Sequence, residues 1–562
     1  MRSIAAAALI VGFTIWRAAA AGLLALALLA PASRASDSAP TSVGESIYRR
    51  GVLGSGAALE GNRQSGNPGL RGADAACVNC HQRSGLGHSE GVVRIPPITG
   101  LYLFHSRAGS AQEAVLPYVE SVHGSRNPYT EASLARAIRA GVDSEGRSLG
   151  VLMPRFMLDD ADMAALTAYL KTLDVARIPG VTDTLLHFAT IITPDADPIQ
   201  RRGMLDVLDN YFADKNRIPL KPSPQMRTSG KTMYSKSMYI ANRHWQLHVW
   251  DLTGPAAGWK AQLEDRLKKE PVMAVVSGLG GSNWGPVHEF CERQQIPCLF
   301  PNVEVPVNAT GDFYSLYLSN GVLLEAGLIA KSLSDAGAGG PPVKTVAQIY
   351  RVGDNGQAAA KALAAALHSQ GIVVRNHALA ATTRSRDAAD AMRNAASADA
   401  LVLWLRPTDV AALGEASPAP ATVFMSGLMG GLEDAPLPPS WRNRVRLTYP
   451  FDLPERRLVR LDYALGWFRI RHIPVVARQI QVDTYLACGL LSETLNDMAD
   501  AMEPTYLVER MQGVLEHRIL TGYYPRLTLA TGQSFASKGG YLVKFAQRTG
   551  TRIAPEGGWM TP

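Results

Sequence analysis

The sequence predicts a multidomain protein in which a small all-α domain is followed by a larger two-lobed α/β domain. The chain has 562 residues, more than a single hydrophobic core usually organises. Residues 42–175 contain amphipathic segments with helical spacing. After residue 182, short apolar runs alternate with helical patterns, which indicates parallel sheets covered by helices. Residues 183–562 exceed one doubly wound sheet, so we expect two lobes.

The composition is that of a globular protein, with 46% hydrophobic and 19% charged residues. The formal net charge is +7, from 56 basic and 49 acidic residues. Residues 1–35 contain Arg2, Arg17 and Arg34 and no acidic residue, so the remainder carries a net charge of +4. This modest charge and the lack of a long Lys/Arg run argue against nucleic acid as a partner.

The N-terminus predicts export to the periplasm. Two apolar runs, residues 4–16 and 18–30, are separated by Arg17 and followed by the small-residue sequence Ser33-Arg34-Ala35. This pattern is typical of a secretory signal peptide over residues 1–35, cleaved after Ala35. The alternative is an uncleaved anchor: each run is shorter than the roughly 20 residues of a spanning helix, but together they exceed it. We expect membrane attachment only in that second case.

Residues Cys77-Val78-Asn79-Cys80-His81 predict one covalent haem c with its iron. Two thiols three residues apart reach the two vinyl groups of one haem, and the adjoining His81 becomes the proximal iron ligand. A zinc site would need a second Cys/His pair nearby, whereas the other cysteines lie about two hundred residues away. A thioredoxin-like pair would need a βαβ setting, whereas this motif lies in glycine-rich sequence.

Three helices are expected around this motif. Ser42 and Glu45 form a capping-box pattern that opens a helix through Arg50. A second helix begins at Thr130-Glu131 and ends at Gly141. The last helix begins at Asp159-Asp160, and we expect it to pack across the first through an apolar stripe of Met163, Leu166, Tyr169, Leu170 and Leu173. A polar insert, residues 51–72, separates the first helix from the haem motif.

Met153 is the predicted sixth ligand of the iron. Its thioether is a soft ligand that favours reduced iron, and Pro154 stiffens the loop that presents it. Met157 and Met163 are interpreted as core residues. Other ligands remain open at this stage: a histidine from His88, His105 and His123, or no protein ligand at all.

Residues 42–173 resemble class I cytochromes c. The resemblance rests on the haem motif, on residues 129–141 and on Met153-Pro154-Arg155-Phe156 leading into residues 158–170. It implies haem attachment at Cys77 and Cys80, axial iron ligation by His81 and Met153, and a final helix that crosses the first. The inserts at residues 51–72 and 95–125 depart from the family pattern. We expect a cytochrome c domain over residues 42–175 and a linker over residues 176–182.

The C-terminal region predicts a series of strands with intervening helices. The expected strands are residues 185–192, 245–250, 272–276, 297–300, 343–350, 372–376, 400–405, 422–425 and 445–448. The glycine-rich turn at residues 278–283 does not fit a dinucleotide-binding fingerprint, because position 283 is Asn. Two interpretations stay open: a purely structural turn, or a turn whose free N–H groups face a cleft and hold a carboxylate or other small anion.

This region resembles type I periplasmic solute-binding proteins of the branched-chain amino-acid family, the substrate-binding components of ABC transporters. The resemblance lies in the pattern of residues 271–283, 296–302 and 346–357. It implies a two-lobed domain over residues 183–562 that closes around a small molecule. The matching ligand-binding positions are Ser277, Ser282, Asn283, Tyr350 and Asp354. The amino-acid-clamping pattern is not intact, so an amino-acid ligand is not implied. Trp284, Tyr314 and Tyr317 belong either to the cleft or to the core.

The sequence favours electron transfer over catalysis. It contains no Gly-x-Ser-x-Gly elbow and no His-Glu-x-x-His pattern, and we expect no catalytic residues. The expected partner is a redox protein, such as a periplasmic dehydrogenase or a terminal oxidase chain. Two alternatives remain: a solute-binding sensor whose haem reports redox state, and a haem enzyme with an open axial position. Cys291 and Cys298 could form a disulfide, and Cys488 is interpreted as a buried thiol.

Overall fold

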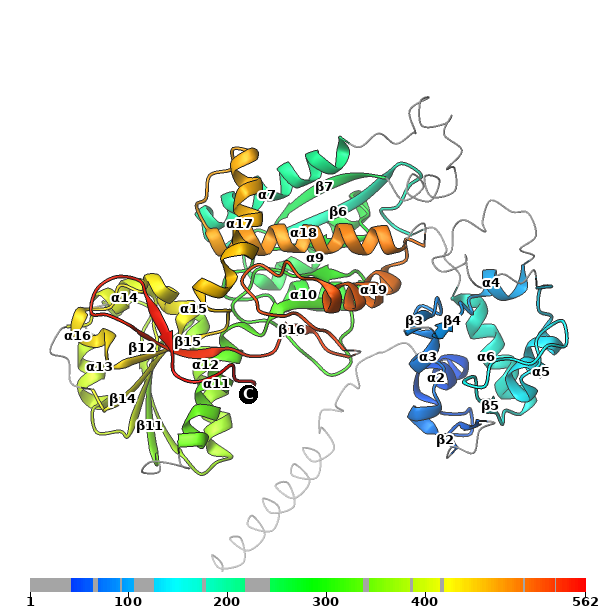
Figure 1. Ribbon diagram of the computed structural model, residues 1–562, viewed down its shortest axis with the longest axis horizontal. Helices are drawn as coiled ribbons and strands as arrows, with labels where there is room; N and C mark the ends of the chain where they lie inside the picture. Colours follow the sequence, from blue (N-terminus) through cyan, green and yellow to red (C-terminus); the bar gives the residue numbers. More distant parts are fainter. Residues whose placement is uncertain are drawn as a thin grey trace, which may run out of the picture. The chain divides into compact units, whose positions relative to one another are not determined.

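The computed structural model describes residues 42–63, 69–90, 93–105, 126–173, 178–217, 243–336, 343–384, 388–414, 419–498, 501–530 and 532–562 (Figure 1). The predicted signal peptide, His123 and the first part of the predicted linker lie outside these residues. The chain divides into two compact units. The first contains residues up to 79 together with 135–142 and 148–170, and the second contains the rest. Within the described ranges, no helix is long and apolar enough to cross a membrane.

Helices α2 (Val43–Arg50) and α6 (Asp160–Thr172) form the core of the first unit. The Ser42 side chain caps α2 by accepting a hydrogen bond from the Glu45 N–H at 3.1 Å. The two helices touch at Tyr48 and Tyr169, whose ring centroids are 5.3 Å apart. At Gly44 they approach so closely that a Cβ atom would lie 2.1 Å from the carbonyl oxygen of Ala165. The predicted packing of the last helix across the first is therefore confirmed.

Short strands accompany these helices. Strands β1 (Glu60–Asn62), β2 (Leu70–Arg71) and β5 (Arg155–Phe156) form an antiparallel sheet in the order β2-β1-β5. The sequence predicts only helices in this N-terminal region. Strands of two or three residues are too short to show the alternation by which strands are predicted. The polar insert at residues 51–72 is thus partly paired with the segment that follows Met153.

The remaining N-terminal elements are also short. They are η1 (Gly72–Ala75), α3 (Val78–His81), β3 (His88–Glu90), β4 (Val93–Ile95), α4 (Gly100–Phe104) and α5 (Glu131–Ala140). Strands β3 and β4 pair antiparallel. Helix α5 is followed by Gly141, whose φ of 72° is the left-handed conformation predicted for a helix C-cap.

A parallel sheet in the order β16-β10-β9-β8-β6-β7 organises the first lobe of the second unit. Its strands are β6 (Leu185–Ile192), β7 (His244–Asp251), β8 (Ala274–Val276), β9 (Cys298–Leu299), β10 (Ser315–Ser319) and β16 (Phe535–Ser537). Its helices are α7 (Pro198–Asn216), η5 (Ala256–Gly258), α9 (Trp259–Lys269), α10 (Gly285–Gln294), α17 (Pro454–Ile470), α18 (Arg478–Met498) and α19 (Pro504–His517). Helix α18 packs on α7 and α19 (Figure 1).

A second sheet in the order β12-β11-β13-β14-β15-β17-β18 organises the other lobe. Strands β11 to β15 run parallel, and β17 and β18 are antiparallel to their neighbours. The strands are β11 (Thr345–Arg351), β12 (Val373–Leu379), β13 (Ala400–Trp404), β14 (Thr422–Met425), β15 (Val445–Tyr449), β17 (Tyr541–Phe545) and β18 (Ile553–Pro555). The helices are α11 (Gly321–Ala336), α12 (Asn355–His368), α13 (Ala388–Ala395), α14 (Pro407–Ala411), α15 (Gly427–Gly430), η7 (Leu432–Asp434) and α16 (Pro439–Arg442).

The chain crosses between the two lobes three times. The chain leaves the first sheet after β10, returns to it after β15 and leaves it again after β16. Each strand predicted in this region overlaps an observed strand, and the two-lobed α/β prediction is confirmed. The carboxyl ends of the parallel strands in both sheets are where this type of fold places its ligands.

Candidate functional site

His81 lies at the end of α3 and is only 6% exposed. Its Nδ1 atom is 3.0 Å from the carbonyl oxygen of Pro96. A carbonyl can only accept, so Nδ1 carries the proton and Nε2 is the nitrogen left for a metal. Burial lowers the pKa of His81 to about 4, although the bond to Pro96 opposes this shift, so the imidazole is neutral near pH 7. A neutral, oriented imidazole fits an iron ligand.

The predicted thioether ligand lies in a loop with a fixed backbone. Met153 is half-buried, and its N–H donates to the carbonyl of Gly150 at 3.1 Å. Arg155 donates from Nη1 to the Met153 carbonyl at 2.5 Å. The guanidinium of Arg155 lies directly against Gly141, where even a Cβ atom would overlap it. These contacts hold the Met153 backbone in place.

The other methionines and the rival histidine ligands have different surroundings. Met157 is 67% exposed, so its interpretation as a core residue is wrong, whereas Met163 is buried in α6 as expected. The Nδ1 atom of His88 is 3.0 Å from the Cys80 carbonyl oxygen. His105 is exposed beyond the end of α4, and His123 lies outside the described residues. Cys77 and Cys80 are both half-buried. The attachment residues and the sixth ligand stay predictions.

A cavity of about 600 Å³ lies at the carboxyl ends of the parallel strands of both lobes. This volume suits a small molecule. Its charged wall residues are Asp195, Asp197, Glu304, Asp354, Asp483, Arg406 and Arg478. Acidic groups therefore outnumber basic groups around the cavity.

Two of the predicted ligand-binding residues, Ser282 and Asp354, line this cavity. Ser277 is fully buried, and its hydroxyl lies 2.8 Å from the Thr484 hydroxyl. Asn283 accepts a hydrogen bond from the Gly285 N–H at 3.0 Å. Tyr350 lies on β11 outside the cavity wall. The aromatic residues left open by the sequence are all buried and do not line the cavity: Trp284, Tyr314 and Tyr317.

The glycine-rich turn after β8 has no free N–H group for an anion at residues 280–282. The N–H of Gly280 donates to the Asn302 carbonyl at 3.2 Å, and that of Gly281 donates to the Thr193 hydroxyl at 2.9 Å. The N–H of Ser282 donates to the Asp195 carboxylate at 2.7 Å. At residues 280–282 the turn therefore offers no open N–H group to an anion, and Asp195 takes the Ser282 N–H.

Asp195 is held as an anion by this turn. Its carboxylate accepts hydrogen bonds from the Ser282 hydroxyl at 2.6 Å and the Thr193 hydroxyl at 2.6 Å. Burial opposes ionisation, but these hydrogen bonds outweigh it and keep the pKa of Asp195 below its usual range. Asp195 was not among the residues predicted from the sequence to bind a ligand. The signal was its position just after the strand at residues 185–192, at a carboxyl end.

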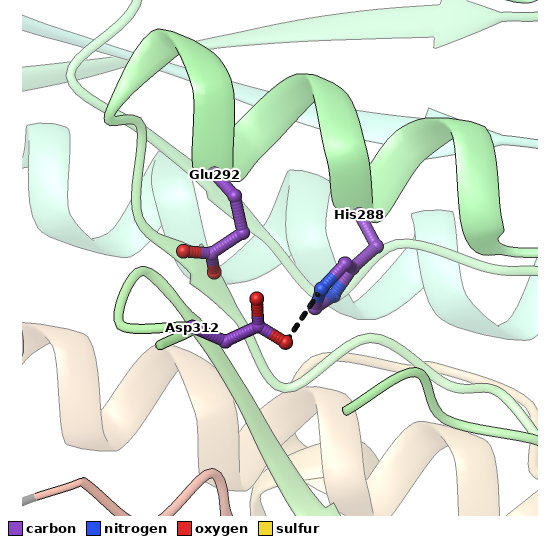
Figure 2. Close-up of side chains that lie close together, drawn as sticks. All are labelled: His288, Glu292 and Asp312. Atoms are coloured by element: carbon purple, nitrogen blue, oxygen red, sulfur yellow. Dashed lines mark hydrogen bonds and ion pairs between the residues drawn. The ribbon is translucent and has the colours of Figure 1, made fainter. Parts of the chain in front are cut away.

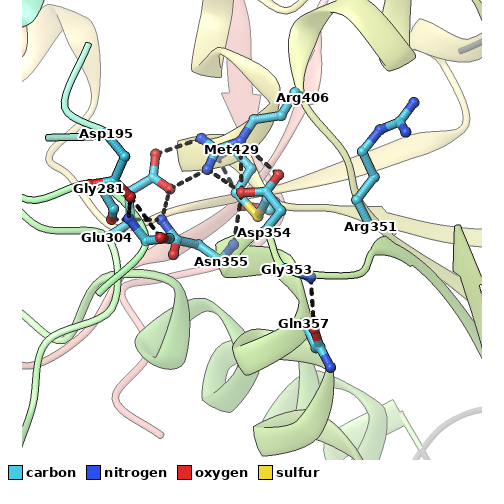
Figure 3. Close-up of polar contacts among 12 residues, drawn as sticks. Asp195, Gly281, Glu304, Arg351, Gly353, Asp354, Asn355, Gln357, Arg406 and Met429 are labelled. Carbon is cyan, nitrogen blue, oxygen red and sulfur yellow. Dashed lines mark hydrogen bonds and ion pairs between the residues drawn. The ribbon is translucent and has the colours of Figure 1, made fainter. Parts of the chain in front are cut away.

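Arg406 joins the two lobes (Figure 3). Its guanidinium contacts both oxygens of Glu304, which follows β9, at 2.7 Å each. It also contacts Asp354, the N-cap of α12, at 2.6 Å and 3.0 Å. Asn355 donates to Glu304 at 2.7 Å. The positive charge of Arg406 is thus already matched by two carboxylates.

Asp483 is the most deeply buried acid on the cavity wall, at 5% exposure in α18. The Tyr524 hydroxyl donates to its Oδ2 at 3.3 Å. Within the described part of the chain, its buried Oδ1 has no hydrogen-bond partner. Burial raises the pKa of Asp483 to about 7, with Gln479 and Tyr524 opposing the shift. Nothing in the local sequence marks this residue, because its neighbours in α18 read as helix core.

A third polar cluster contains His288, Glu292 and Asp312, whose ligand-type atoms lie within 4.8 Å of one another (Figure 2). The imidazole of His288 lies 2.9 Å from the Tyr317 hydroxyl and 2.9 Å from Asp312. The carboxylate of Glu292 accepts the backbone N–H groups of residues 313–315. Through these contacts, the cluster holds in place the loop that leads into β10.

Comparison with known proteins identifies the N-terminal region. Residues 68–174 match the family model of cytochrome c. The chain therefore carries a cytochrome c domain, and this family implies covalently bound haem with iron and a redox partner. A comparison with curated proteins found no match.

Solved structures of binding proteins are similar to the rest of the chain. A fatty acid ABC transporter substrate-binding protein from Thermomonospora curvata is 15% identical over 69% of this chain and 95% of its own, with a TM-score of 0.49. A leucine binding protein from Thermotoga maritima is 10% identical over 67% and 99%, with a TM-score of 0.46. A branched chain amino acid ABC transporter from Thermus thermophilus, solved with valine, is 10% identical over 68% and 97%, with a TM-score of 0.48. The ligands in these names belong to those proteins.

Proposed function

We propose that this protein is an exported, predominantly periplasmic c-type cytochrome that transfers single electrons and carries a fused small-molecule-binding module. One haem is attached through Cys77 and Cys80, and His81 and Met153 are the axial ligands of its iron. The domain around it, residues 42–175, is a mainly helical class I cytochrome c domain. When bound, the haem supplies a one-electron redox centre.

The setting of His81 is the observation that carries this proposal. The Pro96 carbonyl fixes the proton on Nδ1 and so presents Nε2 as a ligand. Because the ring is buried and neutral, no proton has to be displaced before the iron binds. The chain itself therefore performs two tasks at this atom: it orients the ring and it selects the tautomer.

The loop around Met153 supports a six-coordinate iron. Arg155 and Gly150 hold the Met153 backbone, and Pro154 restricts the conformation of the residue before it, Met153. A protein ligand on both faces keeps exogenous molecules off the iron and favours electron transfer over catalysis. The exposed Met157 and the core residue Met163 are less suited to this role.

The C-terminal lobes supply a second, separate task. Their cavity of about 600 Å³ is lined by polar residues from both sheets. We assign to it the reversible binding of a small molecule, without bond-making chemistry. The redox partner is a periplasmic protein of the respiratory type, such as a dehydrogenase that delivers electrons.

Optical spectroscopy tests the axial ligands. The full-length protein, matured in a periplasm, should show a low-spin spectrum and the near-infrared sulfur-to-iron charge-transfer band. Met153→Ala should lose that band and lower the reduction potential, because the soft ligand that favours reduced iron is removed.

Met157→Ala is the matched control and should keep the band, because Met157 is exposed. Intact-protein mass should increase by one haem in all three proteins. A high-spin wild type, or a band that survives Met153→Ala, would contradict His81/Met153 ligation. Either result would favour an iron whose sixth position is open or held by a second histidine.

A further inference from the structure

The cavity between the lobes is negatively charged. Five acidic residues and two arginines line it, and Arg406 is bound on two sides by Glu304 and Asp354. Arg478, Asp195 and Asp197 are all exposed to solvent, where their fields are screened. The acids still outnumber the arginines by five to two, so the wall favours a cationic ligand group over an anionic one.

The place where a ligand carboxylate would bind is filled by the protein's own carboxylate. Asp195 takes the N–H and hydroxyl of Ser282, and Thr193 takes the N–H of Gly281. An anionic ligand group would find no free N–H group at residues 280–282 and would lie beside the ionised Asp195. Both effects disfavour a carboxylate ligand.

Asp483 provides an independent sign of what the cavity needs. This side chain is buried on the wall, and its Oδ1 has no hydrogen-bond partner among the described residues. An unpartnered buried carboxylate oxygen is costly unless a donor reaches it. Phe451 and Tyr524 line the same wall, with ring centroids 5.5 Å apart. Aromatic faces next to a carboxylate attract organic cations.

We propose that the cavity binds an organic cation, a primary amine whose ammonium group donates to Asp483 beside Phe451 and Tyr524. This inference rests on the proposed small-molecule-binding role of the C-terminal lobes and names the class of ligand. The ammonium supplies a donor for Oδ1 of Asp483, which has no hydrogen-bond partner among the described residues, and the acidic wall stabilises its charge. An amino acid is disfavoured because the N–H groups of residues 280–282 are already taken and its carboxylate would lie beside the ionised Asp195.

Titration calorimetry on the full-length holoprotein tests this with ligands matched in size. The probes are 2-phenylethylamine, its neutral analogue 2-phenylethanol, the zwitterion leucine and the anion hexanoate. We expect 2-phenylethylamine to bind at least about tenfold more tightly than the other three, since a charged hydrogen bond contributes roughly 1.5–3 kcal/mol. This comparison needs no variant and so does not depend on folding.

Asp483→Asn should weaken 2-phenylethylamine binding by about tenfold or more, because the charge is removed and the shape is kept. The control Asp265→Asn lies on α9 outside the cavity wall and should bind like the wild type. Equal or tighter binding of 2-phenylethanol, leucine or hexanoate would overturn the proposal, as would no binding of the amine at millimolar concentration. The near-infrared spectrum of the same sample separates this failure from a failure of the electron-transfer proposal. Binding of 2-phenylethanol, leucine or hexanoate in place of the amine would overturn this class of ligand while leaving the binding role of the lobes in place.

Discussion

His81 in the N-terminal region and Asp483 in the cavity are both buried titratable side chains, yet their surroundings prepare them for different tasks. His81 donates a hydrogen bond from its Nδ1–H to the Pro96 carbonyl and is stable as a neutral ring. Oδ1 of Asp483 has no hydrogen-bond partner among the residues that the structure describes, and burial raises the pKa of Asp483 to about 7. Burial disfavours the charged form of both residues.

The two sites therefore differ in what they need from the group that binds to them. A neutral imidazole with its proton fixed is already in the form that coordinates iron. A buried carboxylate becomes a good acceptor only when a donor or a cation approaches it. The first site is therefore prepared before its group arrives, whereas the second is completed by its ligand.

The largest effect is expected when only the haem attachment residues are removed. Cys77→Ala combined with Cys80→Ala should abolish covalent haem completely, since no thiol of the motif remains. The lobes should still fold, and amine binding should persist. Haem staining, intact mass and calorimetry measure these outcomes.

Cys488→Ala is the control for that experiment, because Cys488 is a buried thiol within α18. It should retain the full haem content. Covalent haem in the double variant would mean that attachment does not occur at Cys77 and Cys80.

A second test concerns Glu325 in α11, a buried acid that differs from Asp483 because both of its oxygens are hydrogen-bonded. Glu325 accepts hydrogen bonds from Ser426, the Leu428 N–H and Thr448. Burial still raises its pKa from 4.5 to about 7, despite these bonds. The unfolded chain therefore loses its proton first as pH rises. The free energy of unfolding should fall by about 3 kcal/mol between pH 4.5 and 7 from this group, then level off.

Denaturant unfolding of the wild type and Glu325→Gln, followed by tryptophan fluorescence across this pH range, measures that contribution as the difference between the two slopes. Glu455→Gln, an exposed acid at the start of α17, should follow the wild type. Parallel pH profiles for wild type and Glu325→Gln would show that Glu325 does not titrate in this window.

The smallest effect is expected from a substitution at the contact between α2 and α6 in the N-terminal domain. Gly44→Ala places a Cβ atom against the Ala165 carbonyl and should destabilise the packing of α2 on α6 by about 2 kcal/mol. Urea unfolding followed by haem absorbance measures it. Gly150→Ala, where no atom lies within 4 Å of the added group, should change stability much less. Equal effects of both variants would contradict a close helix contact at Gly44.

Much of the fold was predictable from local patterns. The strand at residues 185–192 matches β6, and the one at residues 422–425 matches β14, because buried parallel strands read as continuous apolar runs. The cap at Ser42 was visible as a four-residue pattern. The short strands β1, β2 and β5 were not, because pairing with distant segments rather than local alternation defines them.

The candidate sites differ in the same way. The haem motif is contiguous, so its chemistry can be predicted from five residues. The cavity draws on Asp195, Glu304, Arg406 and Asp483, which are spread over the second unit. Asp195 and Arg406 each follow a predicted strand and could have been nominated from the carboxyl-end rule. Asp483 could not, since only the packing of α18 places it on the cavity wall.

The sequence by itself determined the haem motif, the order of helices and strands, and the two-lobed α/β architecture, because spacing along the chain encodes each of them. Which strands and side chains come together depends on the tertiary structure and was not predictable from the sequence. The tertiary structure placed β16 in the first sheet, paired Arg406 with Glu304 and Asp354, and filled the turn after β8 with Asp195. The physical reason is that hydrogen bonding and desolvation depend on neighbours in space, and these neighbours are far apart in the chain.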